Sequence, residues 1–267
     1  MTGLQNPALR KATIRLLLIP FAVYTAWMLE TFLLEGSTNL FVRFDPAGLF
    51  LYTIIACIIT GMILPLLCIR KAFITGAVNM FQIGFRSFRR TILACVLTCI
   101  FGYGTVIIFS PFGMDRLTFA NAFLLLLPGA IASVMICFVL IGTHIQAFVR
   151  GGGALLSLSL GIMVTAMLFG MTIFAYFPAV MVKDTVFVLV GVGIIAGLFF
   201  FAVRDVYATT IVVGGCSVFI YADRINPQYL DNTVPGIWIS AGLAACSLII
   251  IHFYLSGNFT TIRIPDK

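Results

Sequence analysis

The chain of 267 residues is 61% hydrophobic and only 9% charged, and its formal net charge is +7. Its mean hydropathy of +1.14 and its apolar runs of about 20 residues exclude a soluble globular protein, because such helices are apolar on every face. The runs do not alternate apolar and polar residues, which also argues against a membrane β-barrel. We therefore predict an all-α, polytopic integral membrane protein with one transmembrane domain over residues 1–267.

Eight apolar segments are long enough, or nearly so, to cross about 30 Å of hydrocarbon. They are residues 14–34, 48–69, 91–113, 118–142, 154–177, 185–203, 206–222 and 236–256. Only Arg204 and Asp205 separate the sixth segment from the seventh. A single helix over 185–222 would be about 57 Å long, too long for one crossing, so the stretch must break as a tight hairpin or as a re-entrant half-span. We predict eight spans, with seven as the alternative.

The basic residues predict the orientation of the chain in the membrane. With eight spans, one side holds both termini and most of the lysines and arginines, namely Arg10, Lys11, Arg15, Arg70, Lys71, Arg86, Arg89, Arg90, Arg150, Arg204, Arg263 and Lys267. The other side holds Arg43, Arg116, Lys183 and Arg224. The positive-inside rule then predicts a multi-pass protein of the cell membrane with both termini cytoplasmic. The basic excess is expected to contact the lipid bilayer rather than nucleic acid, because there is no basic soluble module.

The longest connection on this predicted inner side, residues 70–90, has helical periodicity. An apolar stripe recurs at spacings of four and three residues, followed one position later by polar and basic residues. The stripe consists of Ile74, Val78, Phe81, Phe85 and Phe88. This pattern predicts an amphipathic helix over about 72–89 that lies in the membrane surface. It could be a topological anchor, a gate or lipid sensor, or a docking element through which Arg86, Arg89 and Arg90 bind a cytoplasmic protein such as an ATPase.

Glu30 is the sharpest candidate for a functional residue, because it lies near the outer end of the first span. Ionisable groups inside a span are functional candidates, since a charge in lipid is unfavourable. Its carboxylate could bind a cation, relay a proton or act as a general acid or base; the alternative is that it simply reaches the nearby interface. Glu35 is expected in the following loop. A spacing of five residues does not place the two carboxylates on one face of an α-helix.

Five further polar residues lie in or beside the predicted spans. Arg204 and Asp205 form either an intramembrane pair or a charged cytoplasmic turn. His144, at the inner end of the fourth span, could titrate near neutral pH or contact lipid headgroups, and the same alternatives hold for His252 in the last span. Asn121 is expected to make a hydrogen bond between helices. Together with Glu30 and Glu35, the residues Asn121, His144, Arg204 and Asp205 are candidates for a substrate or ion pathway.

Small residues in two of the spans predict close helix packing. Gly193-x-x-x-Gly197 lies in the sixth span, and Ser157, Gly161 and Thr165 recur every four residues in the fifth. Such patterns let two helix backbones approach each other.

The seven cysteines and two histidines do not form a set with the spacing of a metal site, so we expect neither a metal nor a cofactor. Common catalytic motifs are missing as well, which makes an enzyme less favoured without excluding it. Three functions remain open. The first is a transport component, either a small permease or the membrane subunit of a larger assembly, and the second is an intramembrane enzyme that acts on a lipid or membrane-embedded peptide through Glu30. The third is a scaffold or assembly subunit within a homo- or hetero-oligomer.

Overall fold

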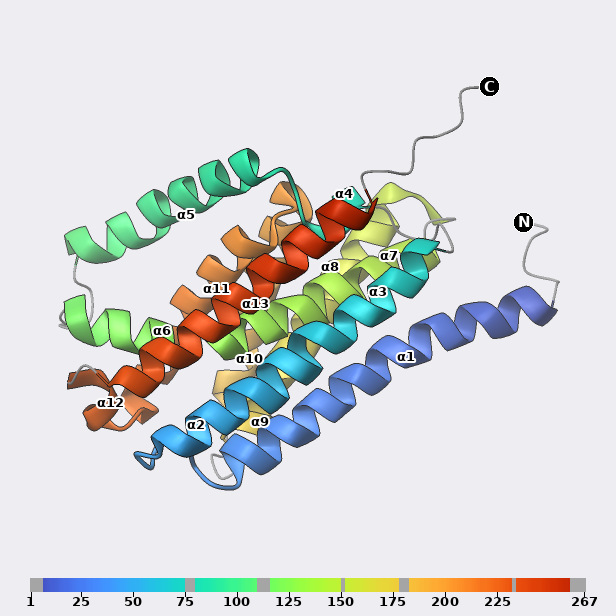
Figure 1. The fold of residues 1–267 in the computed structure, drawn as a ribbon. Coiled ribbons are helices and arrows are strands. Elements are labelled where there is room, and N and C mark those ends of the chain that lie inside the picture. Colours follow the sequence, from blue (N-terminus) through green and yellow to red (C-terminus); the bar gives the residue numbers. More distant parts are fainter. Residues whose placement is uncertain are drawn as a thin grey trace.

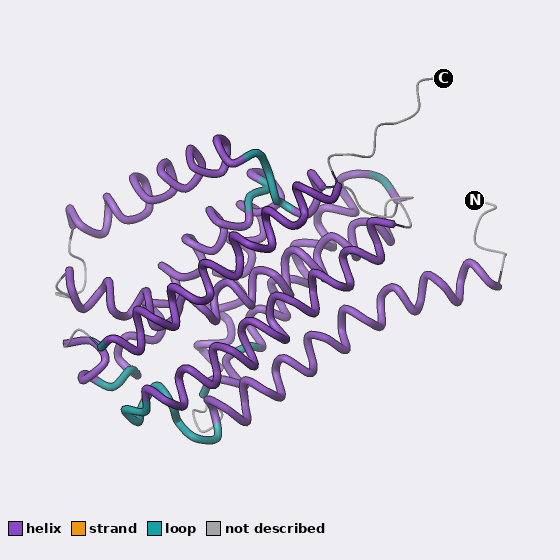
Figure 2. Tube along the Cα trace, in the orientation of Figure 1, coloured by secondary structure: helices purple, strands orange, loops and turns teal. Residues whose placement is uncertain are grey.

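The computed structural model describes residues 7–74, 80–109, 116–149, 152–177, 183–231 and 234–259. This part of the chain is almost entirely helical and contains no strand, which confirms the predicted all-α class. The helices run roughly along one direction and form a single bundle (Figure 1). Short loops and turns connect them (Figure 2).

The helices follow one another with few interruptions. The first half of the chain contains α1 (Pro7–Thr31), η2 (Phe32–Gly36), α2 (Pro46–Tyr52), η3 (Thr53–Ile63), α3 (Leu64–Ile74), α4 (Met80–Ile83), α5 (Phe88–Phe109) and α6 (Arg116–Ser133). The second half contains η4 (Val134–Gly142), α7 (Thr143–Val149), α8 (Ala154–Met171), α9 (Ile173–Tyr176), α10 (Lys183–Val203), α11 (Val206–Tyr221), η6 (Ala222–Arg224), α12 (Pro227–Asp231) and α13 (Pro235–Phe259). The segments η2, η3 and η4 are π-helices, and η6 is a 3₁₀ turn.

Six helical segments of the described chain are long and apolar enough to cross a membrane. They are Leu18–Gly36, Pro46–Arg70, Arg116–Val149, Ala154–Tyr176, Thr185–Val203 and Pro235–Ser256. The two other predicted spans correspond to the helices α5 and α11, so all eight predicted segments are helical over most of their length. The protein is therefore a multi-pass helical membrane protein.

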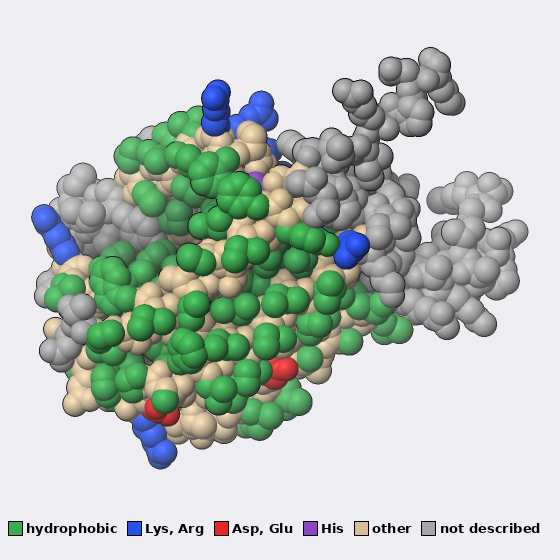
Figure 3. Space-filling model, viewed as in Figure 1, with side chains coloured by type: hydrophobic (Ala, Val, Ile, Leu, Met, Phe, Trp, Pro, Cys, Tyr) green, Lys and Arg blue, Asp and Glu red, His purple; other side chains and the backbone are tan. Residues whose placement is uncertain are grey.

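The surface of the bundle is apolar, as a protein in lipid requires. Large hydrophobic side chains such as Leu155, Phe187 and Ile250 are 79%, 75% and 67% exposed. Figure 3 shows a face covered by hydrophobic side chains, with Lys and Arg toward its edges. Water would not tolerate an apolar surface of this extent on a monomeric soluble protein, so these side chains are expected to contact acyl chains.

The continuous helical stretch Arg116–Val149 forms the centre of the bundle. Of its most apolar part, 83% is buried, compared with 50% or less for the five other spans. Helices from both halves of the chain pack around it, among them α1, α8, α11 and α13. Residues on this central stretch are therefore those that lipid cannot reach, and polar groups near it must find partners inside the protein.

The chain reverses tightly between α10 and α11. The connection consists of Arg204 and Asp205 alone, and Arg204 has a positive φ of 54°. The backbone N–H of Arg204 donates to the carbonyl of Phe200 (2.6 Å), and the N–H of Val206 donates to the carbonyl of Gly84 (3.1 Å). Of the two expected alternatives, the break between the sixth and seventh segments is thus a tight turn between two separate helices.

The predicted amphipathic helix over 72–89 is not a continuous helix, and the prediction is wrong in this respect. The helix α3 ends at Ile74, α4 ends at Ile83, and residues 84–87 are not helical. Gly84 has a φ of 86°, and a Cβ there would lie 2.9 Å from the ring of Phe200. Of the apolar stripe, Phe85 is buried in protein against Tyr207 and His252 rather than facing lipid, whereas Phe88 is exposed. The side chains of its other members, Ile74, Val78 and Phe81, lie outside the part of the chain that the structure describes.

Candidate functional site

Buried polar atoms without partners follow the inward face of the first span. Trp27, Thr31 and Glu35 are spaced by four residues and are at most 1% exposed. Trp27 Nε1, Thr31 Oγ1 and Glu35 Oε2 find no hydrogen-bond partner among the described residues, and neither does Thr53 Oγ1 on the neighbouring η3. A buried polar group left without a partner destabilises a fold by about 1–3 kcal/mol. Such a group in a native structure therefore calls for a functional explanation.

Glu35 lies inside the bundle, so its expected position in a loop is wrong. The π-helix η2 extends the first helical rod to Gly36, and the following segment folds back over it. Leu40 and Phe41, both 2% exposed, cover the acid. The Phe41 N–H donates to the Glu35 carboxylate, and the Leu40 N–H donates to the Glu35 carbonyl oxygen at 3.1 Å.

Glu30 is half-buried, and its Oε2 is enclosed without a hydrogen-bond partner. The π-helix also changes the geometry that separates Glu30 from Glu35. The Ser37 N–H donates to the Phe32 carbonyl five residues earlier (2.7 Å). A wider turn of this kind rotates less per residue than an α-turn and moves positions five apart closer to one face. Both acids thus present an enclosed oxygen toward the protein interior.

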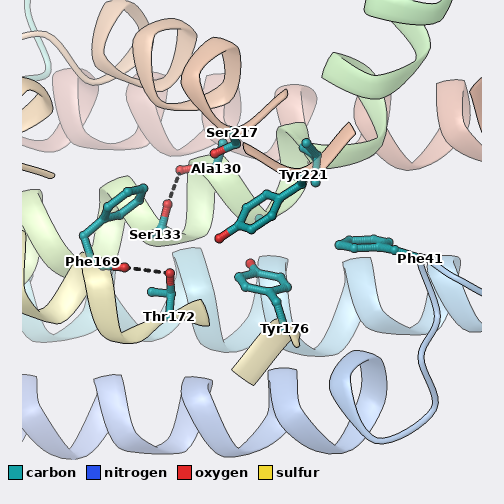
Figure 4. A pocket seen from close by; sticks show the side chains of 10 residues that line it. Phe41, Ala130, Ser133, Phe169, Thr172, Tyr176, Ser217 and Tyr221 are labelled. Carbon is teal, nitrogen blue, oxygen red and sulfur yellow. Dashed lines mark hydrogen bonds between the residues drawn. The ribbon is translucent and has the colours of Figure 1, made fainter. Parts of the chain in front are cut away.

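A small cavity lies between the helices, lined among others by Phe41, Tyr176 and Tyr221 (Figure 4). About 20 Å³ of it is open to the centre of a water molecule, which is room for about one water. The hydroxyl groups of Tyr176 and Tyr221 point into it (Figure 4). The Glu35 carboxyl interacts electrostatically with both tyrosines. The acid and the cavity therefore form one polar centre.

Hydroxyl oxygens line the cavity, and most of their hydrogen bonds are internal. The Ser133 hydroxyl donates to the Ala130 carbonyl (2.9 Å), and the Thr172 hydroxyl donates to the Phe169 carbonyl (2.7 Å) and is also hydrogen-bonded to Tyr221. Since the Ser133 proton is committed to a carbonyl of the same helix, the Ser133 oxygen can act toward the cavity only as an acceptor. Among the described residues there is no group of three or more His, Cys, Asp or Glu that could hold a metal ion. The chemistry fits a proton, a water or a monovalent cation.

Two tyrosines, Tyr52 and Tyr176, pack together next to this polar centre. The Tyr52 and Tyr176 hydroxyls are 3.0 Å apart, and both side chains are buried. Gly129 makes room for them, because a Cβ there would lie 2.6 Å from the Tyr176 hydroxyl and 3.2 Å from that of Tyr52. Phe41 stacks on Tyr176 with ring centroids 6.1 Å apart. A residue without a side chain is thus required at the point where the central helix meets the two tyrosines.

Two loops at the same end of the bundle close over Phe41. The Asn226 N–H donates to the Phe41 carbonyl (2.8 Å), and the Asn226 side-chain amide donates to the Val42 carbonyl (2.9 Å). The Asp45 N–H donates to the Tyr229 hydroxyl (2.7 Å). These bonds join the segment after η2 to the segment around α12. A solute that entered from this end would have to open them.

The opposite end of the bundle holds Arg204 and Asp205, and the charged groups of both have hydrogen-bond partners. Asp205 is fully buried and accepts from the Thr91 hydroxyl (2.7 Å) and from the Ala208 N–H (2.9 Å) at the start of α11. Arg204 donates to the Gln82 carbonyl (3.0 Å) and to the Gln146 side-chain oxygen (2.8 Å). The two residues thus bind different partners and do not form the intramembrane pair considered above.

Arg204 keeps its charge in this environment. Burial, with the Arg86 guanidinium nearby, lowers its pKa to about 10. Its guanidinium also lies over the Phe201 ring, 4.8 Å from the centroid, a cation–π contact that favours the charged form. A pKa of about 10 leaves the group protonated at neutral pH. Arg204 is thus a structural cation of the α10–α11 turn.

The two histidines make bonds within the protein. His144 is buried, and its Nδ1–H donates to the Leu140 carbonyl one turn earlier (2.6 Å), so it does not contact lipid headgroups as one alternative had it. His252 lies 2.8 Å from the Arg86 carbonyl through Nε2 and 3.2 Å from the Tyr207 hydroxyl through Nδ1. Asn121 donates to the Leu230 carbonyl (2.8 Å), which is the expected hydrogen bond between helices.

The structure therefore brings Glu35 near two residues that sequence reasoning missed, Tyr176 and Tyr221. The cavity that these tyrosines line adds Ser133, Thr172 and Ser217, and Tyr52 bonds to Tyr176. Asn121, His144, Arg204 and Asp205 lie elsewhere and have internal partners. A usable signal in the sequence was the presence of tyrosines inside otherwise aliphatic runs, since a tyrosine hydroxyl in the apolar core of a bundle needs a polar partner.

The chain was compared with protein-family models, with curated proteins and with solved structures, and none of the three comparisons finds a match.

Proposed function

We propose that this protein is a membrane transport component, and specifically a small permease whose polar centre binds a proton or a monovalent cation at Glu35. The observation that carries the proposal is the placement of the Glu35 carboxyl. It is 1% exposed, has one oxygen without a hydrogen-bond partner among the described residues, and interacts electrostatically with Tyr176 and Tyr221, which line a small cavity. Intramembrane acids of this kind typically belong to proton relays and ion pathways.

The electrostatics of the site favour a cationic ligand. A carboxylate in a bundle of apolar helices is unstable unless a proton or a cation neutralises it. Among the described residues, the Glu35 side chain accepts a hydrogen bond from the Phe41 N–H, and its Oε2 has no partner. The tyrosines with which Glu35 interacts, Tyr176 and Tyr221, line a cavity that also contains the hydroxyl of Ser133. A proton or a bound monovalent cation would neutralise the acid.

The other two functions have less support. The cavity has room for about one water, which does not accommodate a lipid or a peptide and so disfavours an intramembrane enzyme with Glu30 as acid or base. A scaffold does not require a carboxyl oxygen without a partner at the centre of a bundle. Because the polar centre lies within this one chain, a permease is favoured over a subunit that only completes another protein's pathway.

We also propose the eight-span topology, with both termini cytoplasmic and the cell membrane as location. In support, the start of α1 and the end of α13 lie at the same end of the bundle, as an even number of crossings requires (Figure 1). That end also holds Arg204 and Arg86, in keeping with the positive-inside rule. Arg150, Arg263 and Lys267 lie outside the described residues. Docking of a cytoplasmic protein through Arg86, Arg89 and Arg90 stays a prediction.

Trp27 provides a reporter for testing the role of Glu35. The chain has two tryptophans, so Trp238→Phe leaves Trp27, which is buried on the same helix face as Glu35. In this background we expect the fluorescence of the purified protein to change with pH, or on addition of Na⁺, Li⁺ or K⁺ at constant ionic strength. Glu35→Gln should abolish this change, because the neutral amide neither titrates nor replaces the charged ligand.

The matched control is Asp223→Asn, which neutralises an exposed acid and should leave the titration unchanged. In proteoliposomes, the unmodified protein should dissipate an imposed gradient of the active cation faster than the Glu35→Gln variant does. Equal titrations and equal ion fluxes for the unmodified protein and Glu35→Gln would contradict the proposal.

A further inference from the structure

A second feature of the structure is a large groove on the side of the bundle. It lies between α5 on one wall and α10 and α11 on the other, and about 810 Å³ of it is open to the centre of a water molecule. Figure 1 shows α5 standing apart from the body of the bundle along much of its length. The groove is far larger than the cavity lined by Tyr176 and Tyr221 and shares no residue with it.

The groove is basic at one end and apolar along its length. Arg86 and Arg90 lie at the end where α5 begins. Its other lining residues are Leu93, Ala94, Leu97, Thr98, Phe199, Val203 and Val212. The one hydroxyl among them, on Thr98, donates to the Ala94 carbonyl (2.7 Å). Along the wall, an occupant would therefore meet apolar surface.

The described residues that line the groove include no acid. Asp205 lies between α10 and α11, the two helices of one wall. It is fully buried and already accepts hydrogen bonds from the Thr91 hydroxyl and the Ala208 N–H. Arg90 is exposed, and Arg86 is half-buried. The charge at this end of the groove is thus positive, and an anionic group is its complement.

The dimensions of the groove match one leaflet of a bilayer. From Arg90 to Thr98 the helix α5 rises by about 12 Å, at ~1.5 Å per residue. Half of a hydrocarbon core of about 30 Å is close to this length. Leu93 and Leu97 are 59% and 44% exposed although they line a concavity, so they offer surface to an acyl chain. The arginines lie at the end of α5 that the positive-inside rule assigns to the cytoplasmic leaflet.

We propose that this groove binds a phospholipid with an anionic headgroup, with its phosphate at Arg86 and Arg90 and one acyl chain along Leu93, Leu97 and Val203. Charge complementarity selects an anionic lipid over an apolar transmembrane helix as the occupant, because the described lining of the groove carries two arginines at one end and no acid. The lipid would fill the space between α5 and the α10–α11 pair. It would thereby hold α5 against the rest of the bundle.

The test measures lipid retained by the full-length chain, purified in a neutral detergent and titrated with phosphatidylglycerol or phosphatidylcholine of equal chain length. Native mass spectrometry gives the bound lipid per chain. Arg90→Gln should weaken phosphatidylglycerol binding about fivefold, since one arginine near an anionic lipid contributes about that factor. Arg89→Gln is the matched control, because Arg89 is exposed on the same turn but does not line the groove.

A second pair of variants tests the apolar wall. Ala94→Trp fills the groove and should abolish binding of both lipids, whereas Ile92→Trp should not, because Ile92 is exposed and lies outside the groove. Three results would overturn the proposal. They are equal retention of the two lipids by the unmodified protein, displacement of phosphatidylglycerol by inorganic phosphate, and a change of oligomeric state in Ala94→Trp with lipid retention unchanged.

Discussion

Buried polar side chains occur at both ends of the bundle, but their hydrogen bonding differs. At the end that holds the α10–α11 turn, Asp205 and Arg204 have partners for their charged atoms. Near the other end, Glu35 and Thr31 each keep an atom without one. Satisfied networks of buried groups rigidify a protein, whereas unsatisfied ones mark places where a ligand or a change of state is involved. We therefore assign stability to the first set and function to the second.

Asp205 tests this assignment at the level of one residue. Asp205→Ala removes the cap of α11 and the acceptor of the Thr91 hydroxyl, so we expect the free energy of unfolding to fall by about 2–3 kcal/mol. Asp205→Asn keeps a side-chain oxygen that can cap α11, so it should lower the free energy of unfolding by about half as much. The measurement is unfolding in mixed detergent micelles, followed by circular dichroism.

The exposed acid Asp223 again provides the control, since Asp223→Asn should change stability by less than about 0.5 kcal/mol. Thr91→Val combined with Asp205→Asn should show a coupling of about 0.5–3 kcal/mol in a double-mutant cycle. If Asp205→Ala unfolded no more easily than Asp223→Asn, the structural role of Asp205 would be refuted.

The sequence pointed to Glu30 because it lies deeper in an apolar run than Glu35, and hydropathy is a matter of local composition. The burial of Glu35 depends instead on where Leu40 and Phe41 fold back. That return is fixed by hydrogen bonds to Asn226, almost two hundred residues later. Periodicity within a span carries no information about such a contact.

At the scale of elements, the three π-helices are the feature that the apolar pattern could not predict. They lie at the candidate site: η2 contains Glu35, η3 begins directly after Tyr52, and η4 begins directly after Ser133. Each shifts the residues that follow it relative to an ideal α-helix. Wide turns of this kind are frequent at functional sites. A pattern based on 3.6 residues per turn loses its register there.

The small residues, in contrast, correctly predicted close helix packing, and the structure shows that α10 makes it with α8. A Cβ on Gly193 would lie 2.8 Å from the Cα of Ala166 and 3.0 Å from its carbonyl oxygen. Gly197 faces Thr165, with 3.6 Å between its Cβ position and Oγ1. A side chain at Gly193 would clash with the backbone of α8, which cannot move aside by changing rotamer as a side chain can. The predicted close approach is therefore found in the structure.

We expect Gly193→Ala to lower the free energy of unfolding by about 1–3 kcal/mol, because the added methyl group forces the two helices apart. Gly191→Ala on the same helix is the control, since a Cβ there meets no atom within 4 Å. It should be neutral or stabilise by up to about 1 kcal/mol through helix propensity. The two variants are compared by thermal unfolding in detergent, and a loss of equal size in both would contradict the packing argument.

At the scale of the whole molecule, composition alone predicted the class of the protein and the place of each long helix. Lipid makes this possible, because every backbone polar group in a span must bond within its own helix. What composition could not predict is which helices touch. Contacts between distant parts of the chain determine the central position of Arg116–Val149 and the separation of α5 from the body. A hydropathy profile contains no information about such contacts.

The orientation of the bundle is the remaining property of the whole molecule, and two serines decide it. Ser37 follows η2 and Ser87 precedes α5; both are exposed and lie at opposite ends of the bundle. With both termini cytoplasmic, a cysteine in Ser37→Cys should react with a membrane-impermeant maleimide in intact cells. A cysteine in Ser87→Cys should react only after permeabilisation, because it would lie on the side of the positive charge. The unmodified chain is the control for background labelling, because its seven cysteines are free thiols in apolar helices. Labelling of Ser87→Cys in intact cells would show that the topology is the reverse of the one proposed, and the groove would then lie in the other leaflet.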